Sequence, residues 1–205
     1  MIKQWNINVK QKVKGAIMFN KNFKVTTLAG CLMIALSAVT VSTAAHANIT
    51  NEIKAAQASK ISLKQAITIA SKQASGTLIS AEFDDDDDKA QGGVYEIEFS
   101  TDSTHYEIKV DAMTASIIST ETERLDSGDI NDYNVQRKAK VHIMDAMSKA
   151  DKNTSGQVME IEFKNNRHYD DHHTYYEVEV LKDSQIIELN IDADTGAVFD
   201  KKTKT

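Results

Sequence analysis

Two loops carry the side chains with the clearest potential for metal chemistry. One contains five consecutive aspartates, Asp84–Asp88, and the other reads Arg167-His-Tyr-Asp-Asp-His-His173. Carboxylate oxygens suit Ca²⁺, whereas imidazole nitrogens suit Zn²⁺, Cu²⁺ or Ni²⁺. Adjacent loop residues rarely converge on one ion, so both segments also read as solvated charged loops. The best candidate metal ligands are those of the second loop: His168, Asp170, Asp171, His172 and His173.

Two pairs of glutamates take alternate positions in predicted strands, Glu96 with Glu98 and Glu177 with Glu179. Paired carboxylates can perform general acid–base catalysis. Residues two apart on a strand share one face, however, and apolar residues such as Ile97 take the other face. We interpret the glutamates as the polar, solvent-facing side of a sheet whose opposite side is the core.

The sequence lacks the familiar catalytic motifs. It contains no His-Glu-x-x-His, no Gly-x-Ser-x-Gly and no glycine-rich phosphate loop. His105 and His142 stand alone in different predicted elements, and we expect His105 to serve packing or to lie at the surface. The chain is therefore expected to be a non-enzyme without a cofactor.

An internal repeat organises these residues. The segment Tyr95–Ser119 aligns without a gap on Tyr176–Asp200 at an offset of 81 residues, with nine identities in 25 positions. Upstream the offset is 80, so the two copies differ by a single inserted residue, which falls between Phe83 and Tyr95 or between Phe163 and Tyr176, in a charged loop that can absorb it. Such agreement indicates a duplication.

Each copy predicts one helix followed by three or four strands. In the first copy Leu63, Ile67, Ala70 and Ala74 follow helical spacing, and Ser62 with Gln65 forms a capping box. Gly76 and Gly156 suit the left-handed position at each helix end. Alternating runs then predict antiparallel strands. We therefore expect an α+β protein of two tandem modules, each a helix packed on a 3–4-stranded antiparallel sheet.

These patterns divide the chain into five parts. A signal peptide is predicted over residues 1–47, with Met18 as an alternative start, because lysines precede an apolar run that ends in Ala45-His-Ala47. A leader at 48–60, a module at 61–120, a linker at 121–139 and a module at 140–205 follow. Two other N-terminal interpretations are an uncleaved anchor and lipidation at Cys31.

Charge and cysteine content narrow the possible partners. Residues 1–47 hold six Lys and no acid, which leaves 18 basic against 30 acidic residues in 48–205, a net charge of −12. Such an acidic protein is expected to repel nucleic acids and anionic lipid surfaces. Cleavage after Ala47 removes Cys31, the single cysteine, so disulfides are not expected. The mature protein is predicted to be periplasmic or secreted, without a stable membrane span.

The order of helix, glycine, charged loop and paired strands resembles the PepSY domain. The segments that carry the resemblance are Tyr176–Val180 and Asp192–Val198, with weaker counterparts at Tyr95–Phe99 and Asp111–Ile117. Ala115 replaces Gly196 in the first copy, so we expect its last turn to differ in geometry.

The resemblance implies a non-catalytic module of envelope and secreted proteins, of the kind found in peptidase propeptides. It implies a protein partner, such as a peptidase or an envelope sensor, and it brings no catalytic residues. The expected function is therefore inhibition or regulation of a peptidase through an edge strand. The alternative is a metal-binding or sensing role for the loop at 167–173.

Overall fold

The computed structural model describes residues 43–85 and 90–204 and shows an α+β fold, as predicted. Its strands form one antiparallel sheet of eight, in the order β4-β3-β2-β1-β5-β6-β7-β8. The strands are β1 (Thr77–Asp84), β2 (Val94–Ser100), β3 (Thr104–Asp111), β4 (Ile117–Arg124), β5 (Gln157–Asn165), β6 (Thr174–Lys182), β7 (Gln185–Asp192) and β8 (Val198–Lys204). We call β1–β4 the first half-sheet and β5–β8 the second half-sheet.

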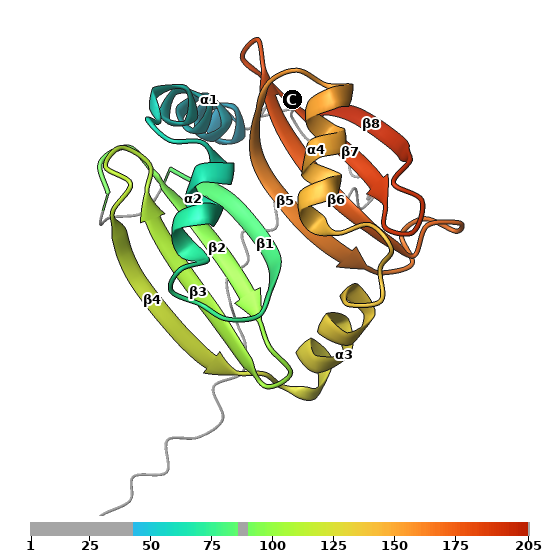
Figure 1. Cartoon of the computed structure of the whole chain (residues 1–205). Coiled ribbons are helices and arrows are strands. Elements are labelled where there is room, and N and C mark those ends of the chain that lie inside the picture. The colour runs from blue at the N-terminus through green and yellow to red at the C-terminus, as the bar shows by residue number, and fades with distance from the viewer. Residues whose placement is uncertain (1–42, 86–89, 205) are drawn as a thin grey trace, which may run out of the picture. The chain divides into compact units, whose positions relative to one another are not determined.

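Four helices accompany the sheet in the described residues: α1 (Thr43–Ala58), α2 (Leu63–Ala70), α3 (Ser127–Gln136) and α4 (Ile143–Asn153). Helix α2 contacts β1, β2, β3 and β5, whereas α4 contacts β5, β6 and β7 (Figure 1). Their buried stripes join the inward residues of all the central strands in a single hydrophobic core. The core is therefore shared between the half-sheets, because strands β1 and β5 run side by side at its centre.

The register at that junction is short. Only three residue pairs are aligned between β1 and β5: Ser80 with Glu162, Ala81 with Ile161, and Glu82 with Glu160. The sequence predicted antiparallel strands within each copy but not this pairing, which places both copies in one sheet. In contrast, β5 and β6 are aligned from Gln157 to Asn165, with one irregularity between Val158 and Glu160.

Local signals explain where the helices begin. The Ser62 hydroxyl accepts from the Gln65 backbone N–H, and the Gln65 side chain accepts from the Ser62 N–H, so the predicted capping box is confirmed. Asp126 and Asp129 form a second box at the start of α3. That helix and the end of β4 occupy most of residues 121–139, where the sequence predicted a linker.

The predicted role of two glycines as helix ends is wrong. Helix α2 ends at Ala70 and α4 at Asn153, before the Ser-Gly pairs. Gly76 has φ +117°, but Gly156 lies outside the positive-φ region. A Cβ at either position would lie within about 2.5 Å of a carbonyl oxygen on the neighbouring strand, 2.3 Å for Gly76 and 2.5 Å for Gly156. Both glycines therefore permit a close backbone approach where a first strand begins.

The last turn of each copy joins β3 to β4 in the first copy and β7 to β8 in the second. The two turns have the same geometry, so the expectation that they differ is wrong. Gly196 has φ 72° and Ala115 has φ 62°. In the first copy the Asp111 carboxylate accepts from the backbone N–H groups of Met113 and Thr114 at 2.8 and 2.7 Å. Asp192 accepts from the two equivalent groups. Ala115 therefore adopts a left-handed conformation that is strained for a residue with a Cβ.

The N-terminal predictions concern residues that are mostly outside the described part. Met18, Cys31 and the apolar run lie there, and residues 43–47 form the start of α1. Further along α1, Ile53 and Ala56 are buried in the core, and the Gln157 side chain donates to the Ala56 carbonyl at 3.1 Å. Among the described helices, none is long and apolar enough to cross a membrane.

Candidate functional sites

The predicted metal-binding loop follows β5 and is held by the second half-sheet. His172 Nδ1 lies 2.7 Å from Asp192 Oδ2, and the His172 ring stacks on Phe199 with ring centroids 3.9 Å apart. Tyr169 donates a hydrogen bond of 2.9 Å to Asp200. Burial alone would raise the pKa of Asp192, but hydrogen bonds from His172 and Thr195 bring it below its usual value.

These contacts engage the loop with the sheet and do not gather its five candidate ligands. In the described residues, two groups of three potential ligands have atoms within 4.8 Å of one another. Neither group includes His168, Asp170, Asp171, His172 or His173. The aspartate run cannot be compared in the same way: Asp84 ends β1 and Asp85 follows it, but residues 86–88 lie outside the described part.

Most glutamates of the strands lie on the sheet face opposite α2 and α4, which we call the polar face. Along every strand of the two central pairs, glutamates alternate with core residues such as Ala81, Ile97 and Ile161. The glutamates of this face on β1–β3 and β5–β7 are Glu82, Glu96, Glu98, Glu107, Glu160, Glu162, Glu177, Glu179 and Glu188, and β4 adds Glu121 and Glu123.

Five of these side chains form an unbroken line across the sheet, which we call the glutamate row. Each is directly opposite the next in the strand register: Glu96, Glu82, Glu160, Glu179 and Glu188. Lys109 on β3 and Lys202 on β8 are aligned with its two ends. Like charges directly opposite each other destabilise a sheet, so the row stores repulsion whenever it is fully ionised.

Proton uptake relieves part of that repulsion. Burial, followed by the charges of Glu96 and Glu98, raises the pKa of Glu82 from 4.5 to about 8. Burial and the charge of Glu179 also raise the pKa of Glu160 well above its usual value. The prediction that Glu96, Glu98, Glu177 and Glu179 line a polar face is confirmed, but Glu179 is buried and not open to solvent.

Helix α1 adds a further carboxylate, Glu52, whose pKa responds to the charge of Glu179 in the glutamate row. Burial raises the pKa of Glu52 to about 7, and the charges of Glu179 and Asp85 act in the same direction. Lys204 opposes this shift because its ammonium group favours the ionised carboxylate. Burial and neighbouring carboxylates therefore raise the pKa of Glu82 to about 8 and that of Glu52 to about 7.

The first half-sheet contains the arrangement that sequence reasoning missed. His105, expected to serve packing or the surface, lies on the polar face with Glu98 and Glu107, and their ligand atoms lie within 4.8 Å of one another. His105 Nε2 is 3.7 Å from Glu98 Oε1. The signal was present in the period-two pattern, since residues 105 and 107 share a face of β3 and β3 pairs with β2.

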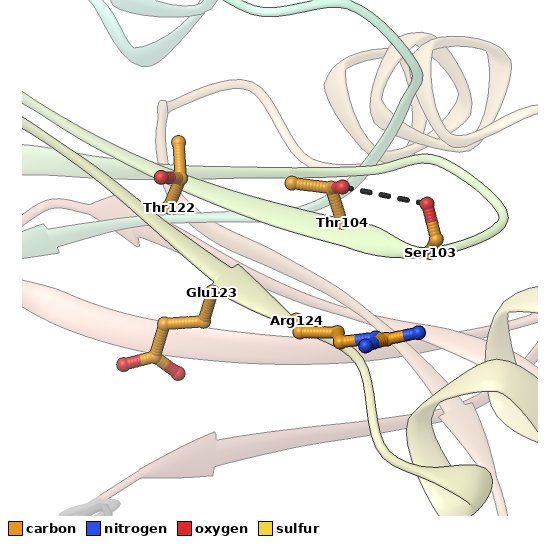
Figure 2. Close-up of a pocket in the computed structure, with 5 residues that line it drawn as sticks. All are labelled: Ser103, Thr104, Thr122, Glu123 and Arg124. Atoms are coloured by element: carbon orange, nitrogen blue, oxygen red, sulfur yellow. Dashed lines mark hydrogen bonds between the residues drawn. The ribbon is translucent and has the colours of Figure 1, made fainter. Parts of the chain in front are cut away.

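The outer strand β4 presents a different kind of site. It forms one edge of the sheet, and most of its side chains are exposed. Two large hydrophobic side chains in the described residues are exposed: Ile117, at the start of β4, and Met113, in the turn before it. At its other end a shallow hollow of about 400 Å³ is lined by Ser103, Thr104, Thr122, Glu123 and Arg124 (Figure 2). Such an edge can pair with an extended segment of another chain.

Comparison with known proteins gave one family. The family model described as "PepSY: Peptidase propeptide and YPEB domain" matches residues 60–121 and again residues 145–202. A crystal structure of a candidate lipoprotein from Clostridium difficile 630 is similar over 75% of this chain and 100% of that chain, with 26% sequence identity and a TM-score of 0.44. A search of curated proteins found no match.

Proposed function

The chain belongs to the PepSY family, of which it carries two tandem copies, and on that premise we propose that it is an exported, non-catalytic module that binds and regulates a peptidase of the cell envelope. The observation that carries the proposal is the double match to a family described by its presence in peptidase propeptides. A propeptide acts by contact, so the function requires a binding surface and no catalytic group.

We place that contact at strand β4. An extended segment of the peptidase would add to the open edge of the sheet, where main-chain hydrogen bonds supply affinity and side-chain pockets supply specificity. Ile117 and Met113 offer apolar contact at one end, and the hollow at Thr122 and Arg124 receives a side chain at the other. The opposite edge, β8, is rich in lysine, which protects an edge from unwanted pairing.

Inhibition assays with the purified protein test the proposal. We expect it to slow an envelope peptidase and to be retained by that peptidase at micromolar concentration. A double variant, Ile117→Lys with Thr122→Lys, places charges along β4 at exposed positions and is expected to weaken binding by at least about tenfold.

The matched control lies on the other edge. Val198→Lys with Thr203→Lys changes the equivalent positions of β8, 81 residues further along, and is expected to leave inhibition unchanged. Failure to inhibit or to retain any envelope peptidase would remove the regulatory function. Equal losses in both double variants would keep the function and remove β4 as its contact.

The loop at 167–173 stays a separate prediction for a metal site. Its ligand atoms do not converge in the described residues, so binding there would require the loop to rearrange. Replacement of His168, His172 and His173 by Ala, followed by calorimetric titration with Zn²⁺, Cu²⁺, Ni²⁺ and Ca²⁺, checks it. Unchanged metal binding would eliminate the loop.

A further inference from the structure

We propose that Glu98, His105 and Glu107 form a binding site for a divalent transition-metal ion of the Zn²⁺ class on the polar face of the first half-sheet. The three residues come from two adjacent strands, β2 and β3, that are paired in register with Glu98 opposite Glu107. A rigid hairpin therefore presents all three, which a flexible loop would not.

The histidine is the observation that points to a ligand. The side chain of His105 is only 9% exposed, and its Nε2 atom is buried without a hydrogen-bond partner. A buried polar atom left without a partner costs free energy, so its persistence calls for an explanation. Nε2 lies 3.7 Å from Glu98 Oε1, and a ring nitrogen of His105 lies within 4.8 Å of a carboxylate oxygen from Glu98 and one from Glu107.

The separations are close to those of a metal site. Two ligands bound at about 2.0–2.1 Å to a tetrahedral Zn²⁺ ion lie roughly 3.3–3.5 Å apart. His105 Nε2 and Glu98 Oε1 are already 3.7 Å apart, and one ligand atom from each of the three residues lies within 4.8 Å of the other two. Small side-chain rotations would bring the three atoms to a common ion.

A neighbouring hydroxyl fixes one of the ligands. Ser80 on β1 donates a hydrogen bond of 2.8 Å to Glu98 Oε2, and the other carboxylate oxygen, Oε1, is the one nearest His105. Hydrogen bonds of this kind from outside the ligand set orient metal-binding carboxylates. The site thus has three protein ligands and one supporting donor, which leaves a coordination position for water.

The ligand set selects the class of ion. Imidazole nitrogen suits Zn²⁺, Ni²⁺, Cu²⁺ and Fe²⁺, whereas Ca²⁺ and Mg²⁺ prefer sites built from oxygen alone. Across the next strand, β4 places Glu121 opposite Glu107 and Glu123 opposite His105. These two carboxylates strengthen the attraction of a cation to this side of the face.

The second copy provides a comparison site in which the metal-binding histidine is absent. Its equivalent residues are Glu179, Ile186 and Glu188, so the imidazole is replaced by a hydrocarbon side chain. In place of Glu121 and Glu123 it has Lys202, which forms an ion pair with Glu188, and Lys204, which forms ion pairs with both glutamates. The second copy therefore supplies its own cations, and we expect no metal there.

Titration of the purified protein with Zn²⁺ tests the proposal, with calorimetry and thermal unfolding as readouts. We expect one equivalent to bind and to raise the Tm, since an ion that binds the folded state stabilises it. His105→Ile copies the second copy at this position and is expected to lower Zn²⁺ affinity by at least about tenfold while preserving the metal-free fold. Ca²⁺ is expected to bind more weakly than Zn²⁺ and to be insensitive to this change.

Two control variants make the test decisive. The His168→Ala, His172→Ala, His173→Ala variant is expected to keep the Zn²⁺ response, and Ile186→His is expected to add no second equivalent. Loss of binding in the triple variant with no loss in His105→Ile would move the site to the loop. The absence of Zn²⁺ binding would overturn the proposal. So would a His105→Ile variant that binds Zn²⁺ and Ca²⁺ as tightly as the wild type does. In either case His105 would remain only an ion-pair partner of Glu98.

Discussion

The two copies place glutamates at the same positions of the polar face but surround them with different groups. Glu179 and Glu188 in the second half-sheet are almost fully buried, and lysines from β8 form ion pairs with both. Their counterparts Glu98 and Glu107 are half-buried. The corresponding residues of β4 are glutamates, and a histidine stands beside them.

This difference shows that two copies of one fold can keep the same glutamates and neutralise their charge with different positive groups. Carboxylates buried on a sheet need either a positive group or a proton, because an isolated buried charge is costly. The second half-sheet uses lysines. At the centre of the sheet, burial raises the pKa of Glu82 to about 8, which favours its protonated form at neutral pH. In the first half-sheet we infer that a metal ion can take this role.

Removal of a lysine should give the largest effect. Lys204 contacts Glu179 and lies 3.7 Å from Glu188. Although burial favours its neutral form, the charge of Glu179 raises the pKa of Lys204 above its usual value. Lys204→Met leaves two buried carboxylates without this ammonium group and should cost about 2–3 kcal/mol, allowing for the partial exposure of the lysine.

Denaturant unfolding at neutral pH measures that loss, and the equivalent position of the first copy provides the control. Glu123→Met alters an exposed β4 residue and should change the free energy of unfolding by less than about 0.5 kcal/mol. Similar losses at both positions would show that the half-sheets do not differ in how their glutamates are neutralised.

Replacement of Glu82, at the centre of the sheet, should give a smaller change in the free energy of unfolding, and one that depends on pH. The folded-state pKa of Glu82 is raised above its unfolded value, so the stabilisation is complete below pH 4.5 and is lost as the pH rises through about 8. Glu82→Gln removes this titration. We expect the variant to be about 1–2 kcal/mol more stable than the wild type at pH 8, after discounting for protons shared along the row.

Unfolding curves recorded between pH 5 and pH 9 check this expectation. The decline in wild-type stability over that range should become shallower in Glu82→Gln. Glu121→Gln is the matched control, since Glu121 is an exposed glutamate on the same face, and its curve should follow that of the wild type. A Glu82→Gln curve parallel to that of the wild type would show that the row is ionised throughout.

The last turns should give the smallest effects, with opposite signs. Ala115 and Gly196 occupy the same left-handed conformation. Ala115→Gly relieves the strain and should stabilise the protein by about 0.5 kcal/mol, whereas Gly196→Ala should destabilise it by about 1 kcal/mol. Denaturant midpoints of the two variants measure both changes, and two changes of the same sign would contradict the shared geometry.

Local signals in the sequence predicted the elements well. The capping box at Ser62, the alternation around Ile97 and the turn glycine at Gly196 each act within a few residues, and the structure confirms all three. The family resemblance is confirmed over both copies. These features depend on backbone preferences and side-chain periodicity, which a single sequence displays directly.

Features that depend on long-range pairing could not be predicted in the same way. The alignment of β1 with β5 brings together residues 80 positions apart, and no local pattern encodes it. The association of His105 with Glu98 depends on the β2–β3 register, so the histidine looked isolated in the sequence. Gly156 was assigned to a helix end because its close approach to β6 is a tertiary contact.

The junction between β1 and β5 has a consequence for how such a protein arises. Ala81 faces Ile161, which is its own counterpart in the repeat, and the pairs on either side exchange in the same way. An isologous contact of this type is what two identical subunits form about a dyad. A single ancestral copy could thus have assembled as a homodimer through its first strand, and duplication with fusion would have made that partnership permanent.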